Sequence, residues 1–376
     1  MDVDTALTLL GGLSPAAFMK RHWQKKPLLV RQAWPGVAPP VSRAALFELA
    51  GRDDVESRLV VQQDGAWRVR SGPLPRRALL PVSRPGWTLL LQGVDLHVPA
   101  AHAMLQPFRF LPAARLDDLM LSWASPGGGV GPHLDSYDVF LLQVQGRRRW
   151  RIGRVADPAW VEGAPLKLLR HFEPTQEWLL EPGDMLYLPP RWGHEGNAEG
   201  GDCMTCSIGF RAPAAAELAR ELLMRLADET EEEGTAWALY RDPGQSATET
   251  PGLLPKTLLA YARAAVAKQL ADRDALPRVL GELLTEPKPQ VWFEGGAAVQ
   301  PGAVRLDARS RMLYDARHVY FNGEALRAAG RDAGLMRRLA DARCLSAAER
   351  ARLSAEAAAL LDDWIAAGWV HGGEVA

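Results

Sequence analysis

Residues 119–210 consist of short apolar runs separated by glycine and proline turns, with little helical periodicity. Runs of this length, broken by residues that end strands, are typical of an antiparallel sheet that closes into a barrel or packs as a jelly roll. After Pro213 the pattern changes, because Leu218, Leu222 and Leu226 recur at the spacing of an amphipathic helix. The sequence therefore predicts an α+β protein in which a β-sheet core precedes a helical region.

In the C-terminal half the sequence pattern changes once more, from helical to mixed strand and helix. Helical patterns continue until Pro287 and Pro289 break the chain, and short strands then surround a turn at Asn322 and Gly323. The helices that follow include one opened by a capping box at Ser346. This mixture is typical of a winged-helix-like module. We expect three segments: a β-core domain over residues 1–212, a helical region over 213–290 and a winged-helix-like domain over 291–376.

Two local patterns mark elements near the N-terminus. Ser14 followed by Pro15 is typical of the N-cap and first turn of a helix. Asp64 and Gly65 lie between two runs rich in β-forming residues, which predicts a hairpin.

Two histidines and one aspartate carry the strongest functional pattern of the chain. His133 and Asp135 stand two residues apart in GPHLDSYDV, and alternate residues of a strand share a face, so both side chains can reach one ion. His194 ends the run EPGDMLYLPPRWGH, in which a turn and a short apolar strand precede it. Two imidazoles and one carboxylate leave coordination positions open, which favours a mononuclear Fe(II) centre over structural zinc.

Two alternatives bear on this interpretation. An isolated HxD pair is often a buried histidine hydrogen-bonded to an aspartate, but here the glycine-rich approach and the second histidine favour a metal. Cys203 and Cys206 form a CxxC pair on a predicted strand. Residues three apart on a strand point to opposite faces, so we expect these thiols to pack rather than to bind zinc or form a redox pair.

An iron centre with open positions needs a co-substrate, and a 2-oxo acid that chelates the metal requires a cation for its far carboxylate. We expect the chain to continue from the ligands as a strand, turn at Gln145 and Gly146, and return as a second strand. On the returning strand Arg148 shares the apolar face of Trp150 and Ile152, while the neighbouring arginines face the other way. Arg148 is therefore the arginine expected to point inward and to grip a carboxylate, with a salt bridge to a protein carboxylate as the alternative.

Composition limits the partners. The chain has 376 residues, with 44 Lys and Arg against 45 Asp and Glu, so it has no overall attraction for nucleic acids or acidic membranes. Basic and acidic residues are also balanced beyond residue 300, so we expect no direct nucleic-acid binding. Three cysteines suit a reducing compartment, and no apolar run reaches the roughly 18 residues that span a bilayer. We therefore expect a soluble, cytoplasmic protein.

Several runs together resemble a known family. GPHLDSYDVF, GRRRW and EPGDMLYLPPRWGHEG resemble the JmjC-type 2-oxoglutarate oxygenases of the cupin superfamily, specifically the bacterial ribosomal-protein arginine hydroxylase branch. The likeness covers most of residues 14–215 and, more loosely, the tail around VYFNGE. It implies a double-stranded β-helix catalytic domain, a helical region that forms a homodimer and a C-terminal winged-helix-like domain.

The resemblance also implies cofactors, site residues and a substrate. Fe(II) would be held by His133, Asp135 and His194, with 2-oxoglutarate and O2 as co-substrates and no catalytic residue beyond the metal centre. Arg148 would bind the distal carboxylate of 2-oxoglutarate, helped by a hydroxyl from Ser122 or, as a second candidate, from Ser207. The implied substrate is an arginine of a large-subunit ribosomal protein, hydroxylated at Cβ.

One residue departs from the family pattern. Cupins usually carry glycine in the turn before the last histidine, where this chain has Arg191. The departure affects the rim of the pocket rather than the metal ligands. Two other functions stay open: the same chemistry on another protein residue, as in a histidyl hydroxylase or a demethylase, or a metal-binding cupin without activity.

Overall fold

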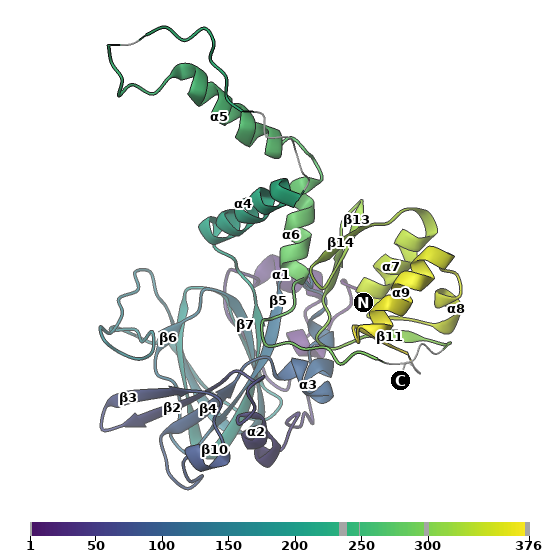
Figure 1. The fold of residues 1–376 in the computed structure, drawn as a ribbon. Helices are drawn as coiled ribbons and strands as arrows, with labels where there is room; N and C mark the ends of the chain where they lie inside the picture. The colour runs from purple at the N-terminus through teal and green to yellow at the C-terminus, as the bar shows by residue number, and fades with distance from the viewer. Residues whose placement is uncertain (1, 233–238, 248, 297–300, 373–376) are drawn as a thin grey trace. The chain divides into compact units, whose positions relative to one another are not determined.

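The computed structural model describes residues 2–232, 239–247, 249–296 and 301–372 (Figure 1). The chain separates into two compact units: Met1–Ala212 with Pro289–Val291, and Pro213–Lys288 with Trp292–Ala376. The helices after Pro213 thus group with the C-terminal residues, and the division into three segments stays a prediction.

The first unit is built on one large antiparallel sheet, which confirms the predicted β-core. Its strands pair in the order β1-β9-β7-β10-β5-β4-β2-β3, while β6 pairs with β10 and β8 pairs with β7. The strands are β1 (Leu28–Val30), β2 (Ser57–Gln63), β3 (Ala66–Ser71), β4 (Trp87–Leu91), β5 (Leu116–Ala124), β6 (His133–Leu134), β7 (Asp138–Arg154), β8 (Gln176–Leu180), β9 (Met185–Leu188) and β10 (Trp192–Phe210).

The predicted turn at Gln145 and Gly146 is wrong, because β7 runs without a break from Asp138 to Arg154. Gly146 adopts a left-handed conformation with a φ of 64° inside the strand, and a Cβ there would clash with the backbone oxygen of Asp202. The register of β10 against β7 shifts at the same place, between Glu199 and Met204. Glycine therefore marks a bulge between two long paired strands rather than a chain reversal.

Short helices surround the sheet. They are η1 (Thr8–Leu10), α1 (Pro15–Arg21), α2 (Arg43–Leu49), η2 (Arg76–Ala78), η3 (Val94–Leu96), α3 (Pro99–Ala103) and η4 (Gln106–Phe108). The expected N-cap is confirmed, since the Oγ of Ser14 accepts from the backbone N–H of Ala17 at 3.2 Å. The expected hairpin is also confirmed, with Asp64 and Gly65 both at positive φ between β2 and β3.

The two cysteines of the CxxC pair point to opposite faces of β10, as expected. Cys206 lies in the main core, which includes Phe140 and Trp123, whereas Cys203 packs in a separate cluster with Ala124 and Ala198. Both thiols are fully buried, because both faces of the sheet are covered at this point. Neither is placed to share an ion with the other.

The second unit contains three helices followed by a winged-helix module, which the sequence predicted. The helices are α4 (Ala215–Glu232), α5 (Lys256–Gln269) and α6 (Ala275–Thr285). The module comprises β11 (Val304–Leu306), β12 (Met312–Tyr314), β13 (His318–Phe321), β14 (Glu324–Arg327), α7 (Gly330–Ala342), β15 (Cys344–Leu345), α8 (Ala347–Arg350), α9 (Ala355–Ala366) and β16 (Val370–Gly372). Asn322 and Gly323 join β13 to β14, and the capping box at Ser346 is present.

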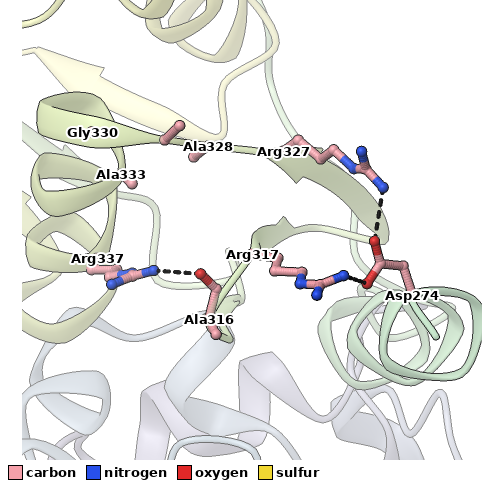
Figure 2. Close-up of a pocket in the computed structure, with 9 residues that line it drawn as sticks. Asp274, Ala316, Arg317, Arg327, Ala328, Gly330, Ala333 and Arg337 are labelled. Atoms are coloured by element: carbon pink, nitrogen blue, oxygen red, sulfur yellow. Dashed lines mark hydrogen bonds and ion pairs between the residues drawn. The ribbon is translucent and has the colours of Figure 1, made fainter.

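Asp274, at the start of α6, ties this helix to the β13–β14 hairpin (Figure 2). Its carboxylate accepts from Arg317 at 2.6 Å and from Arg327 at 2.8 Å, beside a cavity of about 560 Å³. On the other side of the cavity, Arg337 donates to the backbone oxygen of Ala316 at 3.0 Å. The two arginines thus share one carboxylate within the same unit, which balances one of their two positive charges.

Within the described residues, no helix combines the length and the apolar character needed to cross a bilayer.

Candidate metal centre

The structure brings His133, Asp135 and His194 together, so that one ligand atom from each lies within 4.8 Å of the others. Strand pairing explains the convergence: β6 lies antiparallel to the start of β10, with His133 directly opposite His194. Asp135 follows β6 by one residue, and its Oδ2 lies 3.6 Å from Nε2 of His194. The short strand β6 therefore brings His133 and the following Asp135 to His194, which completes the predicted ligand set.

Backbone carbonyls determine which nitrogen of each histidine faces the ion. Nδ1 of His133 lies 2.9 Å from the oxygen of Gly131, and Nδ1 of His194 lies 3.0 Å from the oxygen of Trp192. A carbonyl can only accept, so both Nδ1 atoms carry hydrogen and both Nε2 atoms are available to a metal. Gly131 has a φ of 77°, and a Cβ at this position would lie 2.8 Å from the indole of Trp67.

The protonation state of His194 suits a ligand. Burial and, to a smaller extent, the neighbouring His133 lower its pKa to about 4, although Asp135 acts in the opposite direction. The imidazole is therefore neutral at neutral pH, and neutral imidazole is the form that binds metals.

Arg191 adopts a backbone conformation that glycine favours. Its φ is 68°, in the left-handed region that non-glycine residues seldom adopt. The turn before β10 thus holds an exposed arginine in a conformation that favours glycine. His194 still lies close to His133 and Asp135.

A cavity of about 430 Å³ opens beside the three potential ligands. All six residues singled out from the sequence line it: His133, Asp135, His194, Arg148, Ser122 and Ser207. Trp150, Tyr137 and Met120 also line the cavity, and none of the three was among the predicted site residues. The alternation of side chains along the strand had placed Trp150 on the interior face with Arg148, but it does not distinguish a core position from a cavity position.

Arg148 points inward, as strand parity predicted, and only 5% of it is exposed. Its Nη1 donates to the Oγ of Ser122 at 3.1 Å. Its Nε and Nη2 are buried and have no hydrogen-bond partner, and no carboxylate in the described part of the chain forms an ion pair with it. The alternative of an internal salt bridge is therefore not found. Unpaired buried donors are costly, which fits a site built for the carboxylate of a bound dicarboxylic acid.

The two serines differ in their relation to Arg148. Ser122 on β5 accepts from the guanidinium and donates to the backbone oxygen of Thr205 at 3.3 Å. Ser207 on β10 lines the same cavity, but no hydrogen bond to Arg148 is found. The geometry thus favours Ser122 as the hydroxyl beside the bound anion.

The residues present fit a mononuclear metal with a 2-oxo acid beside it. Two imidazoles and one carboxylate form a three-ligand set, and the unpaired donors of Arg148 belong to a residue that lines the same cavity.

Comparison with known proteins agrees with this geometry. Residues 103–218 match the JmjC domain family, and residues 268–371 match the ROXA-like winged helix family. The chain is 39% identical to the ribosomal protein uL16 3-hydroxylase of Escherichia coli K12, over 73% of this chain and 69% of that protein.

Solved structures extend the similarity to nearly the whole chain. An X-ray structure of E. coli YcfD superposes with a TM-score of 0.84 at 32% identity, covering 96% of this chain and 98% of that one. The structure of YcfD, a ribosomal oxygenase, in complex with cobalt and 2-oxoglutarate gives a TM-score of 0.81 at the same identity and coverage.

Replacing Asp135 with asparagine is expected to weaken Mn(II) binding at least about tenfold, because it removes the anionic member of the ligand set. Titration of the metal-free protein, followed by the electron paramagnetic resonance signal of free Mn(II), measures the change. His171→Ala, at an exposed histidine outside the cavity, is the matched control and should bind Mn(II) as the unmodified protein does. Equal affinity in the two variants would contradict the assigned ligand set.

Proposed function

The chain belongs to the JmjC-domain ribosomal oxygenases, and we propose that it hydroxylates Cβ of an arginine in a large-subunit ribosomal protein. It is an Fe(II)- and 2-oxoglutarate-dependent oxygenase that also uses O2. The observation that supports this substrate most is the similarity of the chain to the ribosomal protein uL16 3-hydroxylase. A further support is the accessible ring of Tyr137, which lines the cavity.

Each side chain of the cavity has a separate task in this proposal. His133, Asp135 and His194 hold Fe(II), while Arg148 and Ser122 hold the distal carboxylate of 2-oxoglutarate. When bound, the iron and 2-oxoglutarate together supply the O2 activation that oxidises a C–H bond, with succinate and CO2 as co-products.

Arg148 orients the bound co-substrate. It is anchored to Ser122, and its remaining donors are buried away from water, so a carboxylate that binds there meets little competition from solvent. A dicarboxylate gripped at one end is restricted in the positions that its other end can take. The fixed distance from Arg148 to the metal ligands therefore selects the length of the co-substrate.

An aromatic ring of the cavity is accessible to a substrate. Tyr137 lines the cavity, and about 40% of it is exposed. A guanidinium is attracted by the face of an aromatic ring, so this side chain is compatible with an arginine target.

Incubating the iron-loaded protein with large-subunit ribosomal proteins and 2-oxoglutarate is expected to add one oxygen atom to an arginine of one of them. Peptide mass spectrometry locates the modified residue, and succinate release gives an independent measure of turnover. Modification of a histidine, loss of a methyl group from a lysine, or no modification of any large-subunit protein would each contradict the proposed substrate.

Replacing Arg148 with alanine is expected to raise the dissociation constant for 2-oxoglutarate about a hundredfold, because a buried charged contact is lost. Calorimetric titration of the Mn(II)-loaded protein measures it, and Mn(II) affinity itself should change little. Arg149→Ala is the matched control, since this neighbour lies on the opposite face and pairs with Glu199. Equal 2-oxoglutarate affinity in the two variants would show that the anion binds elsewhere.

We also propose that the protein acts in the cytoplasm as a homodimer formed through its helical region. Large apolar side chains are exposed on this region: Leu223 and Met224 on α4, Leu259 and Val266 on α5, and Leu254 just before α5. Such exposed apolar groups are typical of a surface covered by a second protein.

Light scattering coupled to size-exclusion chromatography is expected to give twice the 41.2 kDa mass of one chain. A Leu259→Glu, Val266→Glu double variant places two charges on α5 and should shift the mass toward that of one chain. Arg263→Glu, which changes charge on the same helix at a residue that is already polar, is the control. A wild-type mass equal to one chain would contradict the dimer.

A further inference from the structure

Trp150 lies between the two ends of the proposed co-substrate site. It follows Arg148 by two residues on β7, lines the same cavity, and is 5% exposed. The Cζ of Arg148 lies 5.6 Å from the centre of the indole, and the ring of His194 lies 5.8 Å from it. The indole is thus adjacent both to the anion-binding arginine and to a proposed metal ligand.

Strand pairing keeps this indole in place. Trp150 pairs with Gly196 on β10, and a Cβ at Gly196 would lie 2.8 Å from atoms of the six-membered ring. The missing side chain at this position therefore makes room for the indole against the strand. On the other side, Trp150 pairs with Trp178 of β8, which packs against the same apolar cluster.

The indole nitrogen of Trp150 is buried and has no hydrogen-bond partner among the residues that the structure describes. An indole N–H can only donate, and a buried donor without an acceptor is costly, so such groups usually have a partner when the protein is complete. Nε and Nη2 of Arg148 are in the same situation. Three buried donors without acceptors therefore belong to two residues on one face of β7, around one cavity.

A carboxylate fits this set of donors. Its two oxygens offer about four acceptor sites, whereas a single guanidinium usually occupies two of them. The Oγ of Ser122 is already shared with Arg148 and the backbone of Thr205. A further donor is therefore needed to complete the hydrogen bonds of a buried carboxylate at this place.

We propose that Trp150 is a co-substrate-binding residue whose Nε1–H donates to the distal carboxylate of 2-oxoglutarate, while its ring supports the carbon chain between Arg148 and His194. This inference rests on the proposed role of Arg148. The indole thus makes a hydrogen bond to the carboxylate and an apolar contact with the carbon chain. Phenylalanine at this position would keep the apolar contact and lose the hydrogen bond.

Trp150→Phe in the full-length, Mn(II)-loaded protein is expected to raise the dissociation constant for 2-oxoglutarate about tenfold, because a hydrogen bond to a charged group is lost. Mn(II) affinity should stay within about twofold, since no proposed ligand changes. Trp178→Phe, the cross-strand neighbour outside the cavity lining, is the matched control and should leave 2-oxoglutarate binding unchanged. Calorimetric titration measures all three proteins, and Trp150→Leu, which also lacks a donor, replaces the first variant if it does not fold.

Nuclear magnetic resonance tests the hydrogen bond directly. In the Zn(II)-loaded protein with ¹⁵N-labelled tryptophan, the 13 tryptophans give indole N–H signals, and the one missing from the Trp150 variant is assigned to Trp150. Adding 2-oxoglutarate should move this signal downfield, as expected for an N–H that gains a charged acceptor. An unmoved signal would overturn the proposal, as would equal 2-oxoglutarate affinity in the Trp150 and Trp178 variants.

Arg148→Ala separates the two proposals. If it weakens 2-oxoglutarate binding while Trp150→Phe does not, the anion site stands and the role of Trp150 is refuted. If neither variant changes the affinity, the proposed position of the distal carboxylate is wrong as well.

Discussion

The pairing of β7 with β10 is the constraint on which the site depends. β7 presents Arg148 and Trp150, and β10 presents His194 and, opposite Trp150, Gly196. The same β10 segment also pairs with β6 and so places His133. A change in the register of this pair would turn the anion-binding and metal-binding side chains to different faces, because side chains alternate along a strand. The site is therefore a property of strand register more than of any single loop.

Much of this arrangement could be predicted from local sequence patterns. Spacing alone placed His133 and Asp135 on one side of a short strand, and parity alone placed Arg148 inside. The hairpin at Asp64 and the caps at Ser14 and Ser346 were equally local, since each depends on residues within a few positions of one another. These predictions succeeded because the physical cause lies within the segment that was examined.

The features that could not be predicted depend on contacts between residues far apart in the sequence. Gly146 is typical of a turn, and only the strand against which it packs makes it a bulge inside β7. The sequence left open whether the hydroxyl beside Arg148 belongs to Ser122 or to Ser207. Only the folded structure shows that the guanidinium reaches Ser122 on β5. Trp150 was predicted to be interior, but whether an interior indole faces core or cavity depends on how the sheet curves. Arg191 was noted as a departure from the family pattern, whereas its left-handed backbone is visible only in the fold.

Each histidine of the metal centre is hydrogen-bonded to the carbonyl of the residue two positions before it. The orientation of both rings is thus determined within a three-residue segment and does not require the ion. Because the rings need no rearrangement, ions of similar size can exchange at this centre without unfolding the sheet around them. Affinity for divalent ions rises from iron toward copper in sites of this kind. Which metal occupies the centre in the cell would then depend on metal supply together with the type and geometry of the ligands, and not on affinity alone.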